Sequence, residues 1–282
     1  MKVDFAGIGP GKSGTTWVYS VLSKHPQVSI CRVKESNFFN DEYGRGFDWY
    51  HRLFDFTDSS KITGEVSNTY IFSPEAAERI SRYSSDIKLF SILRDPLERA
   101  VSHYMFLIRN GAQFSSFSSA IESRPDLMSR GLYFSHLQPY LTLFSKDQLF
   151  IDVFENIKSE PQGLMNRLTM FLGIENIEIV QAQAEQFSAS KPRSAILARI
   201  VKRGALLVRA LGLPVLVEKV KRSRASKVLY VKSSYDVVNV CGDNLQTYVD
   251  YFREDVHNMS SILEVDLEKL WFDKYKGVDI PK

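Results

Sequence analysis

Two spacings of apolar residues run through this chain. Short apolar runs of strand length alternate with segments whose apolar residues recur every three or four positions, as on one face of a helix. The strand-like runs lie at 2–8, 28–33, 62–66, 88–93 and 148–154. Strands that alternate with amphipathic helices predict a parallel sheet with helices on both sides. We therefore expect one α/β domain over residues 1–282, a three-layer α/β/α arrangement around a central parallel sheet.

The predicted helices carry end signals that place their boundaries. Serine and aspartate are favoured as caps, proline in the first turn, and glycine just after the last turn. The signals are Ser73 before Pro74, Asp95 before Pro96, Gly173 after a helix at 161–172, and Gln246 completing a capping box in a final helix over 243–262. These boundaries separate the helices from the strands that precede them.

A glycine-dense loop follows the first predicted strand. Residues 5–16 read Phe-Ala-Gly-Ile-Gly-Pro-Gly-Lys-Ser-Gly-Thr-Thr, and a helical pattern starts at once. Glycines let the backbone turn sharply and expose its N–H groups, and the first turn of a helix adds unpaired donors. Lys12 supplies a full positive charge, and Ser13, Thr15 and Thr16 supply hydroxyls. We predict that this loop binds a phosphate group; a plain glycine turn before a helix is the alternative.

The spacing of this loop differs from that of an ATP-binding P-loop. That motif places a glycine six residues before the lysine, where this chain has Ala6, and Gly7 is one position too close. Residues 12–16, Lys-Ser-Gly-Thr-Thr, instead resemble the 5′-phosphosulfate loop of the sulfotransferases. Their sulfuryl donor is 3′-phosphoadenosine 5′-phosphosulfate (PAPS).

Two later segments add groups that such chemistry needs. Residues 34–39, Lys-Glu-Ser-Asn-Phe-Phe, follow no helix or strand period, which predicts a loop with both phenylalanines in the core and Glu35 at an edge. A carboxylate there can take a proton from an attacking hydroxyl, and a surface salt bridge is the alternative. Arg94 ends a predicted strand and Ser102 lies two turns into the next helix, so both can meet one phosphate. A kinase usually has a magnesium-binding aspartate at such a strand end, so an arginine at this position argues against a kinase.

These segments occur in the order and spacing of the PAPS-dependent sulfotransferases, and the chain resembles the bacterial and heparan-type members of that family. The resemblance implies a P-loop-like nucleotide-binding fold in which Glu35 is the general base and Lys12 neutralises charge on the leaving phosphate. It also implies PAPS as co-substrate, 3′,5′-ADP as product, and no metal. The donor-binding residues that it implies are Gly11, Lys12, Ser13, Gly14, Thr15, Thr16, Arg94, Ser102, Tyr133, Lys191 and Arg193.

The chain departs from the family pattern at two places. Heparan-type members have a catalytic lysine directly after a glutamate, and this chain has Val66 after Glu65. A late Lys-Gly-Arg loop of the family has Pro192 in place of its glycine here. Glu65, Ser67 and Asn68 are expected near the carboxyl end of a strand, the edge where open α/β sheets bind ligands.

A basic segment follows this late loop. Between 195 and 227 one acid, Glu218, stands among many lysines and arginines that interleave with apolar residues, and Gly212 to Pro214 divide the stretch. We predict a basic helical insertion over 195–232. It covers the acceptor cleft as a lid, contacts a membrane surface, or forms a plain solvated helix pair.

Composition narrows the possible partners. Net charge is only +3, which gives no reason to expect nucleic acid, and two cysteines form neither a disulfide framework nor a metal motif. The first residues enter a strand directly and no long uncharged apolar stretch occurs, so we expect a cytoplasmic protein.

The acceptor is not specified by these patterns. A small molecule, a carbohydrate or a lipid that offers a hydroxyl or an amine fits equally well, and the oligomeric state is open. Trp49 and Tyr50 are expected either in the core or as a platform beside the acceptor. Two alternatives to sulfuryl transfer are an ATP-dependent small-molecule kinase and a catalytically dead binder of membranes or polyanions.

Overall fold

The computed structural model describes residues 2–179, 190–192, 230–232 and 235–278, and for the two short pieces it describes the backbone alone. A five-stranded sheet in the order β2-β3-β1-β4-β5 forms its centre, and every neighbouring pair is parallel. The strands are β1 (Phe5–Gly9), β2 (Val28–Ile30), β3 (Ile62–Val66), β4 (Lys88–Leu93) and β5 (Leu149–Val153). The predicted parallel sheet is confirmed, and β3 and β4 occupy the residues predicted for them.

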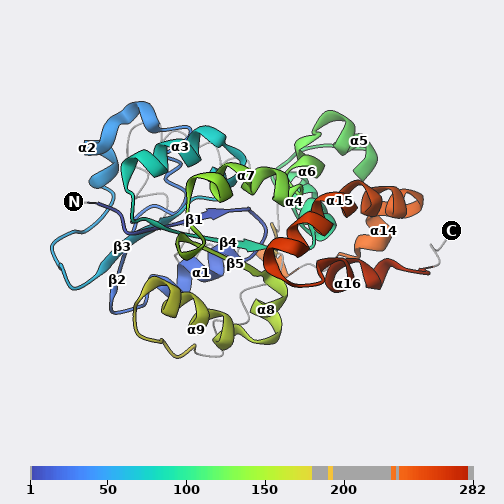
Figure 1. The fold of residues 1–282 in the computed structure, drawn as a ribbon. Coiled ribbons are helices and arrows are strands. Elements are labelled where there is room, and N and C mark those ends of the chain that lie inside the picture. The colour runs from blue at the N-terminus through green and yellow to red at the C-terminus, as the bar shows by residue number, and fades with distance from the viewer. Residues whose placement is uncertain (1, 180–189, 193–229, 233–234, 279–282) are drawn as a thin grey trace.

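Helices lie on both faces of this sheet, as Figure 1 shows. The α-helices are α1 (Thr15–Leu22), α2 (Gly46–His51), α3 (Pro74–Tyr83), α4 (Pro96–Arg109), α5 (Phe117–Ser123), α6 (Asp126–Ser129), α7 (Tyr133–Leu143), α8 (Phe154–Ser159), α9 (Pro161–Leu172), α14 (Val237–Cys241), α15 (Leu245–Leu263) and α16 (Leu267–Phe272). Short 3₁₀ turns occur at Tyr43–Arg45, Tyr70–Phe72, Lys146–Gln148, Gly242–Asn244 and Asp273–Tyr275.

The alternation of side chains along the strands divides the core between the two faces. Phe90 and Ile92 of β4 pack in one cluster with residues of α1 and α9. Leu89 and Leu93 pack in the other cluster with residues of α3, α4, α7 and α15. Because successive strand residues point to opposite faces, one short apolar run supplies both layers of the core. The predicted three-layer α/β/α architecture is therefore confirmed.

Most of the predicted helix boundaries are also confirmed. The Ser73 side chain accepts from the amide of Ala76, the Asp95 carboxylate accepts from the amides of Leu97 and Glu98, and Gly173 ends α9 with φ 80°. Each partner satisfies a backbone group that a helix end leaves unpaired.

The capping box at Gln246 is wrong. Residues 242–244 form a 3₁₀ turn, α15 starts after it at Leu245, and the Asn244 side chain makes no capping bond. The side-chain amide of Gln246 donates instead to the Asp250 carboxylate at 2.9 Å, one turn further along the helix. The side chain therefore does not bond to the backbone at the start of the helix, as a capping box requires.

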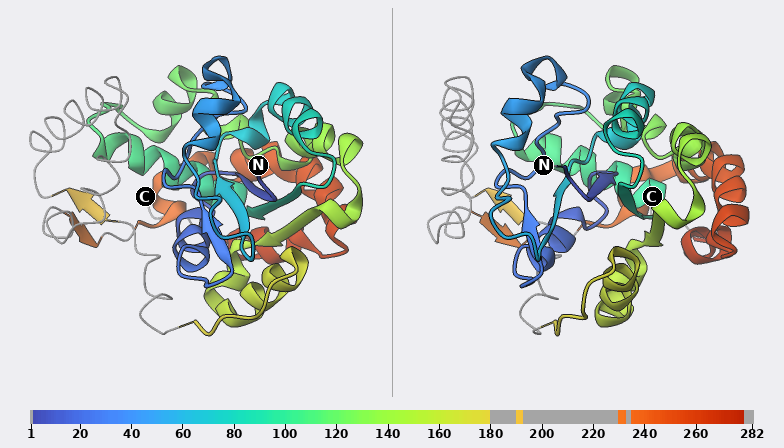
Figure 2. Two further views of the ribbon diagram at one scale, coloured as in Figure 1. Left: turned by 90° about the vertical axis from the view of Figure 1, so that its left-hand side faces the viewer. Right: turned by 60° about the vertical axis from the view of Figure 1, so that its left-hand side comes forward.

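The last three residues of the predicted basic insertion over 195–232 are extended and not helical, and so is part of the predicted loop that precedes it. Ser190–Pro192 forms strand β6 in place of the predicted loop, and it pairs antiparallel with β7 (Tyr230–Lys232), the last residues of the predicted helical segment. Figure 2 shows this small sheet apart from the five-stranded one. Residues 193–229, which include Arg193 and the body of the segment, lie outside the described residues.

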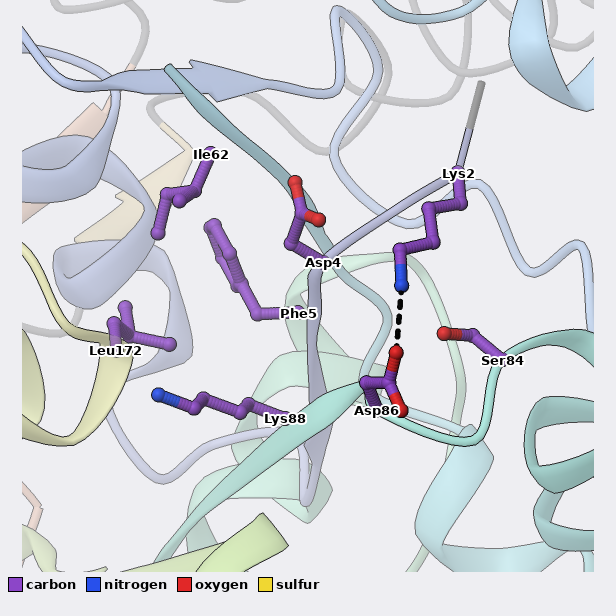
Figure 3. A pocket seen from close by; sticks show the side chains of 8 residues that line it. All are labelled: Lys2, Asp4, Phe5, Ile62, Ser84, Asp86, Lys88 and Leu172. Carbon is purple, nitrogen blue, oxygen red and sulfur yellow. Dashed lines mark hydrogen bonds and ion pairs between the residues drawn. The ribbon is translucent and has the colours of Figure 1, made fainter. Parts of the chain in front are cut away.

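A pocket opens at the amino ends of β1, β3 and β4 (Figure 3). Its charged groups are already paired: Lys2 meets Asp86 at 2.9 Å, and the Lys88 ammonium donates to the Phe171 carbonyl at 2.6 Å. Asp4 accepts from the backbone of Thr63. This edge is opposite to the one where the strands deliver the predicted site residues.

Replacement of Phe252 tests the helical layer formed by α4, α7 and α15. Its ring is fully buried and lies against Gly131, where an added Cβ would come within 2.6 Å of it. We expect Phe252→Ala to lower the free energy of unfolding by roughly 3–5 kcal/mol, because it removes buried apolar atoms and leaves a cavity. Urea denaturation measures the change. Met170→Ala, at a site that is 73% exposed, should stay within about 0.5 kcal/mol of the parent; equal effects of the two changes would contradict this packing.

Candidate active site

The loop between β1 and α1 presents backbone donors that have no acceptor. Gly9, Lys12 and Gly14 all have positive φ, at 113°, 75° and 84°. A Cβ on Gly9 would lie 2.3 Å from the carbonyl oxygen of Asn68, so only glycine fits there. Within the described chain, the amides of residues 11–16 donate to no backbone or side-chain acceptor. A loop of this kind followed by a helix start is suited to an anion.

The Ser13 hydroxyl adds an orphan group to this loop. Its oxygen is fully buried and finds no hydrogen-bond partner among the residues that the structure describes. A buried hydroxyl without a partner is costly, so such a group indicates a missing ligand or water. The unpaired amides and this hydroxyl are donors that fit the 5′-phosphate end of a nucleotide such as PAPS.

Lys12 adds the positive charge of the loop. Its ammonium lies 4.8 Å from the centre of the Phe106 ring on α4. Burial, together with the nearby charges of Arg109 and Arg94, lowers the pKa of Lys12 to about 8, and Glu35 acts in the opposite direction. A cation that is poorly compensated in this way favours an incoming anion.

Arg94 joins the loop to α4. It ends β4, donates from Nη1 to the carbonyl oxygen of Lys12 at 3.1 Å, and forms an ion pair with Glu98 at 2.6 Å. Burial alone would raise the pKa of Glu98, but the charges of Arg94 and Lys274 lower it to about 2. The guanidinium is therefore held beside the loop and keeps N–H groups for a further acceptor.

The other predicted donor-binding residues lie in three places. Ser102 is buried on α4, two turns beyond Arg94. Tyr133 is fully buried, and its hydroxyl donates to the Arg94 carbonyl at 2.8 Å, so it supports that strand end. Lys191 lies in β6, where only the backbone is described, and Arg193 lies outside the described residues. Nucleotide contacts by these residues stay predictions.

Glu35 stands at the same edge of the sheet. The segment 34–39 is a loop, as predicted, with Phe38 and Phe39 fully buried. The Glu35 amide donates to the carbonyl of Val66 at the end of β3, and its side chain is 39% exposed. Its Oε1 atom accepts from Lys34 Nζ at 2.7 Å and from Asn68 Nδ2 at 2.6 Å. The carboxylate is thus fixed, open to solvent, and close enough to Lys12 to affect its charge.

Comparison with known proteins decides the family. A family model described as the sulfotransferase domain matches residues 4–202, more than half of the chain. The chain belongs to the sulfotransferase domain family.

Curated relatives of this sulfotransferase domain cover part of the chain. Mus musculus heparan sulfate glucosamine 3-O-sulfotransferase 3B1 is 34% identical over 179 residues, 60% of this chain and 46% of that protein. The membrane-associated sulfotransferase kil1 of Dictyostelium discoideum is 39% identical over 109 residues, 38% of this chain and 23% of that protein. The chain therefore spans less than half the length of these two relatives.

Two solved structures share its fold over nearly the whole chain. The sulfotransferase from Alicyclobacillus acidocaldarius has a TM-score of 0.68 at 21% identity and covers 96% of this chain and 99% of its own. Mouse sulfotransferase SULT7A1 complexed with PAP has a TM-score of 0.57 at 13% identity, and the match covers 99% of this chain and 90% of that protein. At these identities the likeness concerns the fold.

A buried glutamate supports the site of this sulfotransferase domain, and local sequence patterns did not predict its role. Glu65 is fully buried at the end of β3, and its carboxylate accepts from four hydroxyls. These are Ser36 at 2.5 Å, Tyr50 at 2.6 Å, Ser67 at 2.8 Å and Tyr70 at 2.9 Å. Burial raises the pKa of Glu65, and these bonds act against that rise. Tyr50 is therefore a core residue and not an acceptor platform.

Neither a metal site nor a membrane span emerges from the described residues. No group of three or more histidine, cysteine or acidic side chains comes together there in a way that could hold a metal. Asp152, which resembles a metal-binding aspartate by its strand position, forms an ion pair with Arg167 at 2.8 Å. No described helix has both the length and the apolar character needed to cross a bilayer.

The pKa of Lys12 gives a testable pH dependence for anion binding. The ammonium is charged below about pH 8 and loses its proton above it, whereas the charge on a phosphomonoester is constant above about pH 7. We expect the affinity for 3′,5′-ADP, measured by titration calorimetry, to fall as the pH rises through about 8. Lys12→Arg keeps its charge and should lose this dependence; equal pH profiles for the two proteins would contradict the role of Lys12.

Proposed function

We propose that this protein transfers a sulfuryl group from PAPS to a hydroxyl or an amine of an acceptor. The observation that carries the proposal is the acceptor-free amide cradle of residues 11–16, one strand away from a fixed and partly exposed carboxylate, Glu35. The sulfotransferase family supports the reaction class. The neighbour in complex with PAP supports the choice of nucleotide through its fold alone.

In this proposal the chain binds its donor at two positions. The amides of residues 11–16 and the Ser13 hydroxyl hold the 5′-phosphate, and Lys12 and the hydroxyls of Thr15 and Thr16 add charge and donors. Arg94 and Ser102 hold the 3′-phosphate. PAPS brings a sulfuryl group attached to a phosphate that can leave. The loop and Lys12 stabilise the negative charge that grows on this phosphate during transfer.

Glu35 takes the acceptor's proton. As the acceptor oxygen or nitrogen forms its bond to sulfur, the sulfur–phosphate oxygen bond breaks, and its electron pair stays with the phosphate. The released proton passes to the Glu35 carboxylate, so no other base is needed. Val66 is fully buried and offers no charge where heparan-type members have lysine. Among the described residues, Lys12 and Lys34 are the cations that act on Glu35.

The acceptor that we propose is a carbohydrate. Several curated relatives are named heparan sulfate glucosamine 3-O-sulfotransferases, and they match about 60% of this chain. Transfer from labelled PAPS to heparan sulfate, to a lipid and to a phenol, with the products identified by mass, tests this choice. Label in the glycan alone is the expected result, and label in another acceptor alone would overturn it.

Replacement of the base gives the direct test of mechanism. We expect Glu35→Gln to lower kcat by about 10²-fold or more, because it removes general-base catalysis while keeping the shape of the side chain. The affinity for 3′,5′-ADP should not change. Glu42→Gln is a matched control, since that side chain is similarly exposed (37%) and pairs with Arg45 outside the site.

Two outcomes would contradict this account. Wild-type turnover in Glu35→Gln would remove the base from the mechanism. Tighter calorimetric binding of ADP than of 3′,5′-ADP would remove the 3′-phosphate site and favour a kinase.

A further inference from the structure

Asn68 lies between the donor loop and the proposed base. Its backbone packs against β1, since a Cβ on Gly9 would come within 2.3 Å of the Asn68 carbonyl oxygen. Its side chain packs over the loop, where a Cβ on Gly11 would lie 3.6 Å from both the Cβ and the Nδ2 atoms of Asn68. The same Nδ2 atom donates to Glu35 Oε1 at 2.6 Å. One side chain therefore connects the two halves of the site.

The two oxygens of Glu35 are in different situations. Oε1 accepts two hydrogen bonds, from Asn68 Nδ2 and from Lys34 Nζ. Oε2 accepts none from the residues that the structure describes, and the side chain is 39% exposed. Hydrogen bonds to one carboxylate oxygen fix the plane of the group and leave the other oxygen as the available proton acceptor.

We propose that Asn68 is a positioning residue that makes Glu35 Oε2 the atom that accepts the acceptor's proton. This inference rests on the proposed function, in which Glu35 is the base. The acceptor's O–H bond breaks, its proton goes to Oε2, and its oxygen forms the bond to sulfur as the sulfur–phosphate oxygen bond breaks. Asn68 takes no proton; it holds Oε1 and sets the base relative to the loop.

The two ends of the Asn68 amide are in different situations. The Asn68 Oδ1 atom is buried and has no partner in the described chain, although nearby Ser67 and Thr69 are hydrogen-bonded. The Oδ1 atom of Asn40 is buried and unpaired in the same way, so the nitrogen end of the Asn68 amide, which donates to Glu35, is what distinguishes this residue.

Two cations and one neutral donor act on Glu35 among the described residues. Lys34 contacts it from its own loop, and Lys12 acts on it from the donor loop. Glu65 lies behind Ser36 and Ser67 and is occupied by hydroxyls. Asn68 is the uncharged donor in this set, and a donor to a carboxylate favours its ionised form. Loss of this donor leaves Lys34 as the one described residue that donates to Oε1.

The test compares two replacements of Asn68 with one matched control. Asn68→Ala removes the donor, and Asn68→Asp keeps the shape but places a second carboxylate beside Oε1. Asn40→Ala is the control, because the Asn40 amide donates to the neutral hydroxyl of Thr69 in the same region, at 2.8 Å. Turnover is followed as release of 3′,5′-ADP from PAPS over a range of heparan sulfate concentrations, and with water alone.

We expect Asn68→Ala to lower kcat by roughly 10- to 100-fold, the effect of losing one hydrogen bond to a charged group. The KM for heparan sulfate should stay near that of the parent, and Asn68→Asp should lose more of kcat, because its carboxylate repels that of Glu35. Neither change should alter the affinity for 3′,5′-ADP, which also shows that the variants fold. Asn40→Ala should match the parent in all three measurements.

Distinct results would overturn the two proposals. If Glu35→Gln is inactive but both Asn68 variants keep the parent's kcat, the base stands and the role of Asn68 falls. If Asn68→Ala weakens 3′,5′-ADP binding at unchanged kcat, Asn68 belongs to donor binding. If Glu35→Gln is fully active, the proposed function fails first.

Discussion

The unpaired backbone donors at the end of β1 are the constraint on which the site depends. Strand β1 lies between β3 and β4, so the loop that follows it meets the carboxyl ends of both neighbours. Three left-handed residues turn this loop so that the amides of residues 11–16 find no acceptor within the described protein. Unsatisfied donors are unfavourable in the free protein. An anion that accepts hydrogen bonds from these amides removes this unfavourable free energy, which stabilises the bound state.

The base is tied to this loop through β3. The amide of Glu35 donates to Val66, Asn68 contacts both Gly9 and Glu35, and buried Glu65 holds the hydroxyls of Ser36 and Ser67 on either side. A carboxylate that is buried without a cation must be surrounded by donors, and here those donors belong to the two segments that carry the base and its partner. The buried carboxylate of Glu65 therefore helps to hold the partly exposed carboxylate of Glu35 in place. Arg94 holds the donor loop on its other side, because it links the carbonyl of Lys12 to α4.

Local patterns in the sequence predict most of the fold, and tertiary contacts account for what they miss. The apolar runs at 62–66 and 88–93 match β3 and β4, and the cap at Asp95 places α4, since these features depend on neighbouring residues alone. The capping box at Gln246 fails because a partner one turn away competes for the side chain. The loop at 34–39 and its edge position are predictable, but the bond from Asn68 to Glu35 joins residues 33 positions apart. The glutamate inside the apolar run 62–66 indicates a buried carboxylate that needs donors. Its four hydroxyl partners come from separate segments, so local patterns do not identify them.

A crystal structure of the protein with bound 3′,5′-ADP would show whether the nucleotide occupies the two predicted phosphate positions. The 5′-phosphate should lie against the amides of residues 11–16 and the Ser13 hydroxyl, and the 3′-phosphate against Arg94 and Ser102. Glu35 should face the open side of the 5′-phosphate. A nucleotide bound elsewhere, with these amides and the Ser13 hydroxyl still without partners, would contradict this prediction.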